Sequence, residues 1–161
     1  MQEKTNVMRI LDQKKIPYQM HSYEDTEAVS GKEVAQVLGE DPRRLFKTLV
    51  TFGKSGRHYV FLVAAEAKLD LKKAAALTGE KSLEMLKSKE LLPLTGYVHG
   101  GCSPIGMKKV FPTFIDKGAE DFETIFVSAG KIGYQIEIAL EDLAKILVFT
   151  TADLEEEDEN Q

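Results

Sequence analysis

The sequence predicts an α+β fold with a mixed, largely antiparallel sheet flanked by helices. Helical patterns dominate the first part of the chain, whereas short β-rich segments dominate after Leu94. The chain also lacks the regular alternation of strand and helix that produces a doubly wound parallel sheet. At 161 residues, with no internal repeat and no linker that divides it, the chain is expected to form one domain around a single core.

The first two expected elements are helices. Apolar side chains recur at helical spacing in residues 5–14. Farther on, Ser30 is followed three residues later by Glu33, the spacing of a capping box, in which each side chain bonds the backbone N–H of the other and begins a helix. That helix is expected over residues 31–38, because Gly39 can take the left-handed conformation that closes a helix.

A β-hairpin is expected next. After a short helical turn that begins at Asp41 and Pro42, the pattern changes from Lys47 on. Leu49, Val50 and Phe52 lead to a turn at residues 53–56, and residues 59–64 form an apolar run. Two runs of this kind, joined by a tight turn with two glycines, are typical of paired antiparallel strands.

Helices and strands then follow in mixed order. Asp70 can cap a helix over residues 71–77 and Gly79 can end it, and a further helix is expected over residues 82–88. Beyond that helix, the expected strands cover residues 96–98, 110–115, 124–127, 134–138 and 148–150. The last helix, over residues 140–146, lies between the final two strands.

The net charge of −5 comes from the C-terminal end of the chain. Six of the 26 acidic residues lie in residues 153–159, which leaves 20 acidic residues against 21 basic ones. The body of the protein is therefore nearly neutral, and its charge argues neither for nor against a nucleic-acid partner. Because dense like charge repels itself and buries nothing, we expect a domain at residues 1–152 and a disordered, dispensable acidic tail at residues 153–161.

Composition excludes several classes of protein. No apolar run approaches the roughly 20 residues that span a bilayer, and the charged N-terminus does not resemble a signal peptide. Cys102 is the only cysteine, so no internal disulfide can form, and a reducing cytoplasm is the expected compartment. His21, His58 and His99 are scattered without metal-ligand spacing, and neither a metal nor another cofactor is expected.

A glycine-rich loop, GGCSPIG at residues 100–106, is the most prominent local motif. Glycine lets the main chain approach a ligand, and Pro104 fixes φ and removes a donor. The loop has neither the spacing of a GxxxxGK(S/T) phosphate loop nor the order of a GxGxxG dinucleotide turn. Cys102 and His99 could form a nucleophile and its base, but residues three apart face each other only on a helix, which the glycines disfavour.

Several short motifs follow one another between about Ile16 and Phe149. They are FKTL at residues 46–49, LDLKK at 69–73, TGY at 95–97, GGCSPIG at 100–106 with Lys108 and Lys109, PT at 112–113, ID at 115–116, SAGK at 128–131 and QIE at 135–137. In order and spacing these motifs resemble those of the YbaK family of aminoacyl-tRNA deacylases. Any one of these would be a weak signal, but their coincidence is specific.

The resemblance implies a partly barrel-like α+β domain related to the editing insertion of bacterial prolyl-tRNA synthetases. Family members similar to this chain remove cysteine wrongly attached to proline tRNA and can act on other cysteinyl-tRNAs. The implied partners are an aminoacyl-tRNA and, in a transient complex, a prolyl-tRNA synthetase. The resemblance implies no membrane partner and no DNA partner.

The resemblance also implies functional residues. Lys47 matches the family's essential lysine, set beside the ester and the terminal adenosine. The positions that match the substrate pocket are Tyr23, Ser30, Thr48, Gly100, Gly101, Pro104, Ser128, Gly130 and Gln135. In the implied mechanism the substrate's own thiol attacks its carbonyl carbon, and a near-attack pose makes up for a missing protein nucleophile. A nearby lysine favours the thiolate, and N–H groups of the glycine-rich loop can stabilise the oxyanion.

Two positions depart from the family pattern and leave alternatives open. Gln135 stands where an aspartate is usual, and Ser30 stands where a bulky aromatic residue lines the pocket. The first exchange removes a charge that could anchor the substrate's α-ammonium group, although the amide oxygen can still accept from it. One alternative is therefore release of another small amino acid such as alanine. A second is a noncatalytic aminoacyl-tRNA-binding or regulatory module, and a third is a hydrolase that uses Cys102.

Overall fold

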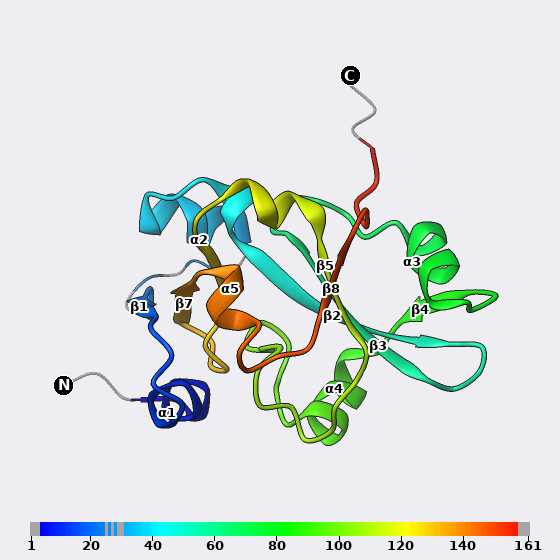
Figure 1. Ribbon diagram of the computed structural model, residues 1–161, viewed down its shortest axis with the longest axis horizontal. Helices are drawn as coiled ribbons and strands as arrows, with labels where there is room; N and C mark the ends of the chain where they lie inside the picture. The colour runs from blue at the N-terminus through cyan, green and yellow to red at the C-terminus, as the bar shows by residue number, and fades with distance from the viewer. Residues whose placement is uncertain (1–3, 25, 27, 29–30, 158–161) are drawn as a thin grey trace.

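Two β-sheets meet at the centre of the molecule, and helices pack around them (Figure 1). The computed structural model describes residues 4–24, 26, 28 and 31–157. The helices of this part of the chain are α1 (Asn6–Gln13), α2 (Gly31–Leu38), α3 (Leu71–Thr78), α4 (Ser88–Thr95), α5 (Leu140–Leu143) and the 3-10 helices η1 (Pro42–Arg44) and η2 (Lys117–Asp121). The strands are β1 (Gln19–Ser22), β2 (Phe46–Gly53), β3 (His58–Ala64), β4 (Leu83–Met85), β5 (Thr113–Asp116), β6 (Ile125–Ser128), β7 (Tyr134–Ile138) and β8 (Thr150–Ala152).

The larger sheet has the strand order β4-β2-β3-β5-β8 within the described residues. The expected hairpin is confirmed, because β2 and β3 pair antiparallel with Lys47 opposite Val63. The turn between them closes with the Gly53 N–H donating to the Arg57 carbonyl at 2.8 Å. β4 pairs antiparallel with β2, whereas β5 pairs parallel with β3 and β8 pairs parallel with β5. This sheet is therefore mixed, as expected.

The smaller sheet has the order β1-β7-β6 in the described part of the chain, with both neighbouring pairs antiparallel. It continues the larger sheet, because a bridge between Leu45 and Phe126 places β6 beside the start of β2. Side chains from both sheets share one core, in which Phe46, Val60 and Ile136 are buried. The α+β fold with a mixed, mostly antiparallel and partly barrel-like sheet is confirmed.

Local sequence signals set the ends of two helices. Thr5 caps α1, with its hydroxyl accepting from the Met8 N–H at 3.3 Å. Asp70 caps α3 by accepting from two N–H groups of the first turn, and Gly79 ends that helix at φ +76°, a conformation that favours glycine. Both helices lie where the sequence predicts them. Ser30, the first residue of the expected capping box at α2, lies outside the described residues.

Three elements differ from the expectation. Residues 82–88 do not form a helix, because Leu83–Met85 pairs with β2 as β4 and the next helix begins only at Ser88. Residues 96–98 form no strand, because Gly96 ends α4 in the left-handed conformation. β1 lies in a polar segment that predicts no strand, yet it pairs with β7. β1 and β4 are strands because each pairs with a strand that is distant in the sequence, and no local pattern reveals this pairing. The other expected elements differ mainly at their ends.

The start of the acidic C-terminal segment is part of the fold. Leu154 is fully buried in the cluster that α3 and β3 share. Its N–H donates to the Asp116 carboxylate at 2.9 Å, and its carbonyl accepts from the Asp70 N–H at 2.7 Å. The expectation of a disordered tail is therefore wrong for residues 153–157, which one apolar side chain and its backbone bonds anchor. The rest of that expected tail, residues 158–161, lies outside the described residues.

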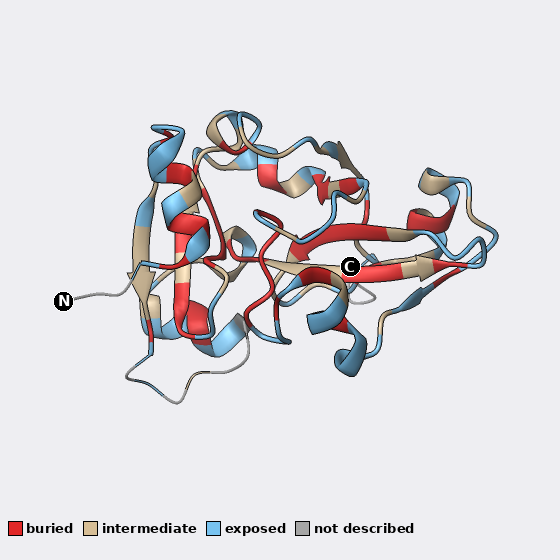
Figure 2. Cartoon of the chain, turned by 90° about the horizontal axis from the view of Figure 1, so that it is seen from below, coloured by how far each residue is buried: buried red, intermediate tan, exposed pale blue. Residues whose placement is uncertain are grey.

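Buried residues run along the strands of both sheets, while the helices keep exposed residues on their outer sides (Figure 2). The main cluster joins α1 to both sheets, and two smaller clusters lie under α2 and α3. Within the described residues, none of the helices has the length and hydropathy that a membrane crossing requires. The packing of these clusters fixes the junction of the two sheets, where the candidate site lies.

Candidate functional site

A cavity of about 320 Å³ lies where the two sheets meet. Its walls come from α2, β2, the segment after β3, the loop after α4 and the adjoining ends of β6 and β7. The lining residues are Tyr23, Val34, Leu45, Phe46, Lys47, Thr48, Leu49, Ala65, Leu91, His99, Gly100, Cys102, Ser128 and Gln135. The fold thus brings six of the sequence-predicted site residues around one space: Tyr23, Lys47, Thr48, Gly100, Ser128 and Gln135.

Lys47 supplies the ammonium group of this cavity. Its Nζ donates to the Ala65 carbonyl at 3.2 Å. The side chain is half-buried, and this burial lowers the pKa of Lys47, while the negative charge of Glu155 opposes the change. No carboxylate of the described residues forms an ion pair with Lys47. The protein therefore compensates the charge of Lys47 only in part.

Thr48 carries an unsatisfied hydroxyl next to Lys47 in the sequence. Its Oγ1 is buried and is the one buried side-chain oxygen or nitrogen of the described residues without a hydrogen-bond partner. Leaving such an atom unpaired costs about 1–3 kcal/mol. A hydroxyl can both donate and accept, so a ligand in the cavity that Thr48 lines can remove this cost with either kind of group.

Another wall is formed by the ends of β6 and β7. Ser128 and Gln135 are register partners, and the Ser128 hydroxyl accepts from the Gly130 N–H at 3.1 Å. Tyr23 follows β1 and is buried, and its N–H donates to the Gly133 carbonyl at 2.8 Å. Ser128 thus supports the turn after its own strand, and Gln135 adds an amide that can donate or accept.

The glycine-rich loop reaches the cavity through Gly100, which has φ +87°. Gly101 instead packs against the chain, since a Cβ there would lie 3.0 Å from the Ile132 backbone nitrogen. Gly130, at φ +90°, would bring a Cβ to 3.0 Å from the Tyr97 ring. These glycines allow the loop and the turn after β6 to approach each other closely.

Four of the residues expected in the pocket are not among the described lining residues. Gly101, Pro104 and Gly130 do not line the cavity. Pro104 is buried, and the two glycines have the packing contacts given above, so the three residues shape the loop and the turn that support the cavity. Ser30 lies outside the described residues, and the structure does not place it.

Cys102 also lines the cavity, but its thiol is poorly suited to act as a nucleophile. Its exposed fraction is 7%, and burial raises the pKa of the thiol to about 12. The thiol therefore stays protonated at neutral pH, whereas the thiolate is the reactive form. His99 is exposed, and no hydrogen bond joins it to Cys102 among the described residues. The structure disfavours a hydrolase that uses Cys102.

The apolar walls of the cavity are not predicted by the sequence motifs. Val34 of α2, Phe46 and Leu49 of β2, and Leu91 of α4 all line it. Each is an apolar residue in a helix or strand, so the sequence does not distinguish it from an ordinary core residue. These side chains line a cavity only because the two sheets come together in the folded protein.

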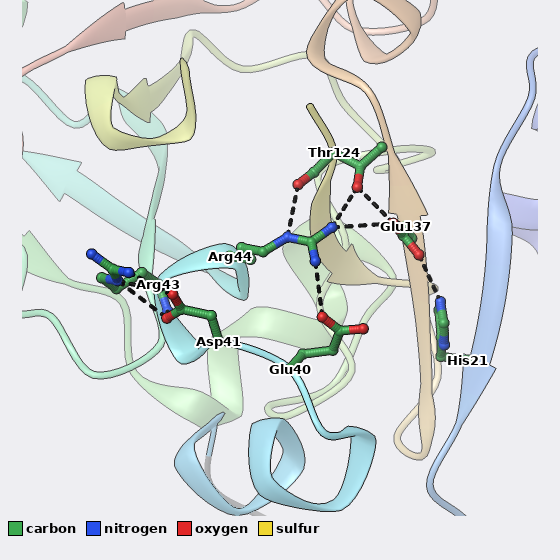
Figure 3. Close-up of polar contacts among 7 residues, drawn as sticks. All are labelled: His21, Glu40, Asp41, Arg43, Arg44, Thr124 and Glu137. Carbon is green, nitrogen blue, oxygen red and sulfur yellow. Dashed lines mark hydrogen bonds and ion pairs between the residues drawn. The ribbon is translucent and has the colours of Figure 1, made fainter. Parts of the chain in front are cut away.

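A network of polar and charged side chains ties the smaller sheet to the start of β2 (Figure 3). The Arg44 guanidinium donates to the Glu40 carboxylate at 2.8 Å, to the Thr124 carbonyl at 3.2 Å and to the Glu137 carboxylate at 3.1 Å. The other carboxylate oxygen of Glu137 lies 3.0 Å from Nε2 of His21. The network therefore joins residues of β1, η1 and β7 with the segment before β6.

Glu137 is the centre of this network and gives the QIE motif a structural reason. The Thr124 hydroxyl donates to it at 2.6 Å, and this bond is the main cause that lowers the pKa of Glu137, against the effect of burial and with help from His21 and Arg44. The Arg44 guanidinium lies 5.0 Å from the centre of the Phe126 ring, which is fully buried. These contacts fix β7 against the segment that leads into β2.

Among its described lining residues, the cavity brings together a cationic group and several polar groups, and the Cys102 thiol there stays protonated. An ammonium group, an unsatisfied hydroxyl, an amide and a glycine of the loop surround the space. Such an arrangement favours catalysis by positioning and charge. No group of three His, Cys, Asp or Glu side chains in the described part of the chain could hold a metal ion.

Comparison with known proteins agrees with the motifs. Residues 25–146 match the family model of the aminoacyl-tRNA editing domain. The chain is 46% identical to an Enterococcus faecalis protein named "Putative Cys-tRNA(Pro)/Cys-tRNA(Cys) deacylase EbsC", over 90% of this chain and 89% of that protein. It is 32% identical to the proline–tRNA ligase of Thermosipho melanesiensis, over 68% of this chain and 19% of the ligase.

A solved structure shows the same fold. The crystal structure of "a putative trans-editing enzyme for prolyl tRNA synthetase" has a TM-score of 0.83 at 24% identity and covers 97% of this chain and 100% of that chain. The family match spans most of the chain and includes Lys47, Thr48, Gly100, Ser128 and Gln135. The resemblance predicted from the motifs is confirmed, and this chain belongs to the family of aminoacyl-tRNA editing domains.

Proposed function

We propose that this protein is a trans-editing deacylase that removes cysteine from mischarged Cys-tRNA(Pro), and also from Cys-tRNA(Cys). The observation that carries the proposal is a cavity that holds the Lys47 ammonium and the unsatisfied Thr48 hydroxyl, while Cys102, the one cysteine of the chain, lines it as a protonated thiol. Membership of the editing-domain family and the 46% identity to the Enterococcus faecalis relative support it.

The size of the cavity suits the aminoacyl end of a tRNA. Pockets for small ligands have volumes of about 300–1,000 Å³, and this cavity, at about 320 Å³, lies at the lower end of that range. It has room for a small amino acid and its ester linkage, whereas the body of the tRNA must remain outside. This size favours small side chains such as those of cysteine and alanine.

In the proposed reaction the substrate supplies the nucleophile. A free thiol with a pKa of about 8.5 is partly ionised at neutral pH, and the ammonium group of Lys47 favours the thiolate. The thiolate attacks the carbonyl carbon of its own ester. A C–S bond forms, the C–O bond to the ribose breaks, and the ribose oxygen takes up a proton equivalent to the one that the thiol released. The products are a cyclic thiolactone and free tRNA.

The lining residues have separate roles in this proposal. Lys47 stabilises the thiolate and the negative charge that develops on the carbonyl oxygen. Thr48 forms a hydrogen bond with the bound ester, which removes the cost of its unpaired hydroxyl. Gly100 lets the backbone approach the substrate, and the Gln135 amide oxygen accepts from the α-ammonium group. Together they hold thiolate and carbonyl in a reactive pose.

A prolyl-tRNA synthetase is the proposed partner that selects the tRNA. The match to the Thermosipho melanesiensis ligase relates this chain to a segment within a synthetase. Because acidic and basic residues nearly balance outside the C-terminal segment, the charge of the domain offers little selectivity of its own. A transient complex with the synthetase supplies the missing selectivity.

Release of alanine or another small amino acid is the second candidate. Gln135 favours it, because an uncharged amide in place of a carboxylate leaves more of the selectivity to the shape of the cavity. Alanine has no thiol, so water must then attack the ester. The two candidates differ in the amino acid released and in the nucleophile.

Release assays with Cys-, Ala- and Pro-tRNA(Pro) distinguish these candidates. We expect rapid release of cysteine, while Pro-tRNA(Pro) stays intact. Release of alanine alone would establish the second candidate, and binding without release would establish a noncatalytic module. Lys47→Ala is the control in which release is expected to be strongly reduced. Lys54→Ala, at an exposed position in the hairpin turn, is the matched control that retains activity.

A further inference from the structure

We propose that Glu155, in the acidic C-terminal segment, is a positioning residue for Lys47. This inference rests on the proposed function of Lys47 and adds a residue that holds the lysine and the adjoining cavity wall in place. Nothing in the sequence singles out Glu155, which is the first of three consecutive glutamates. Its contacts in the fold are what distinguish it from its neighbours.

The backbone around Glu155 is fixed on both sides. Leu154 is fully buried and bonded through both its N–H and its carbonyl. The Glu156 N–H donates to the Lys68 carbonyl at 2.9 Å, and Glu155 pairs with Leu69 in an antiparallel bridge. The segment therefore delivers the Glu155 side chain to a defined place rather than to solvent.

That place is the end of β3, beside Lys47. The Glu155 carboxylate accepts from the Ala64 N–H at 2.9 Å, and the Lys47 ammonium donates to the Ala65 carbonyl at 3.2 Å. The Ala65 N–H donates to the Leu45 carbonyl at 2.7 Å. The two charged side chains thus hold consecutive residues of one backbone segment, and Ala65 itself lines the cavity.

The two charges also act on each other. Burial lowers the pKa of Lys47, and the Glu155 charge raises it. Burial raises the pKa of Glu155, and the charges of Asp116 and Asp153 raise it further. The hydrogen bond from the Ala64 N–H and the charge of Lys47 lower it. Asp153 is itself paired with Lys73 at 3.1 Å. Loss of the Glu155 charge is therefore expected to favour the neutral form of Lys47, which cannot stabilise a thiolate.

Glu155→Gln tests this role, because glutamine keeps an oxygen that can accept from the Ala64 N–H but carries no charge. Glu156→Gln is the matched control, since Glu156 is exposed on the same segment. The ionisation of Lys47 is followed by NMR of carbon-13-labelled lysine side chains, with the signal assigned through Lys47→Arg. The pH profile of kcat/KM for cysteine release is measured in parallel.

In Glu155→Gln we expect the titration midpoint of Lys47 to move to a pH about one unit lower. The alkaline decline in kcat/KM is expected to move to lower pH as well. Glu156→Gln is expected to leave both unchanged, and Glu155→Asp, which keeps the charge, to stay nearer to the wild type. An unchanged midpoint in Glu155→Gln, or an equal shift in either other variant, would overturn the proposal. The NMR midpoint does not depend on turnover, so a wild-type protein that released no amino acid would contradict the proposed function alone.

Discussion

Lys47 is the residue on which the proposed chemistry depends most directly. Its ammonium group is half-buried and has no ion-pair partner among the described residues, so it can act on a developing negative charge. Lys47→Ala is expected to lower kcat/KM for cysteine release by about 100-fold while the fold stays intact. Release kinetics and thermal unfolding check both parts. An equal loss in Lys54→Ala would show that the effect is not specific to the cavity.

Cys102 lies in the same cavity, but its thiol has no chemical role in this account. Because burial raises its pKa to about 12, Cys102→Ala is expected to leave kcat/KM for cysteine release unchanged. The smaller side chain is expected to lower the free energy of unfolding by about 1 kcal/mol. Loss of release by a folded Cys102→Ala protein would instead identify Cys102 as the nucleophile.

For single residues, the sequence motifs predict which ones come together at the cavity better than they predict the role of each residue. Lys47, Thr48 and Gln135 were all expected in the pocket, and all line the cavity. The close approach at Gly101 and Gly130 depends on distances between separate segments, and no residue type in the motif encodes those distances.

At the scale of elements, the network centred on Glu137 joins β7 to the segment that leads into β2. The pKa of Glu137 is lower in the folded protein than in the unfolded chain, where it is about 4.3. The ionised carboxylate therefore stabilises the fold at pH values above about 4.3, and this contribution is lost as the pH falls through the lower pKa of the folded state. Glu137→Gln is expected to reduce the free energy of unfolding by about 2 kcal/mol at pH 7.

Denaturant unfolding between pH 7 and acid conditions checks this expectation. The difference in the free energy of unfolding between the wild type and Glu137→Gln should be constant near neutral pH. It should shrink at acid pH, where Glu137 becomes protonated. Glu123→Gln, at an exposed position nearby, is the control and should behave as the wild type. A difference that stayed constant through the acid range would contradict a stabilising charge on Glu137.

Elements with their own end signals could be predicted from the sequence, and elements defined by pairing could not. Asp70 and Gly79 mark the ends of α3 locally, and the structure has that helix. The segment Leu83–Met85 carries no such signal, and its antiparallel pairing with β2 makes it a strand. Helix propensity in a short segment is weaker than this pairing.

At the scale of the whole molecule, the C-terminal segment packs against α3 and β3. Leu154 is fully buried, so Leu154→Ala is expected to lower the free energy of unfolding by about 2–5 kcal/mol. A chain that ends at Ala152 should likewise unfold at lower denaturant concentration than one that ends at Glu157. Equal stability of the two shortened chains would contradict a structural role for residues 153–157.

The fold class could be predicted because many motifs coincide, while the C-terminal boundary of the folded domain could not. Six acidic residues in a short stretch indicate a solvated tail, and one leucine among them does not alter that pattern. The structure shows that Leu154 fills a site between α3 and β3 and brings Glu155 to Lys47's end of the sheet. Tertiary packing thus overrides composition at this boundary.

In the proposed function the substrate's thiol, held beside Lys47, cleaves its own ester. The most direct test compares release of cysteine and of serine from the same tRNA(Pro), since a hydroxyl is far less ionised than a thiol. We expect rapid release from Cys-tRNA(Pro), with a thiolactone detected by mass spectrometry, and little release from Ser-tRNA(Pro). Equally efficient cleavage of the serine ester, or no release of cysteine, would contradict this mechanism.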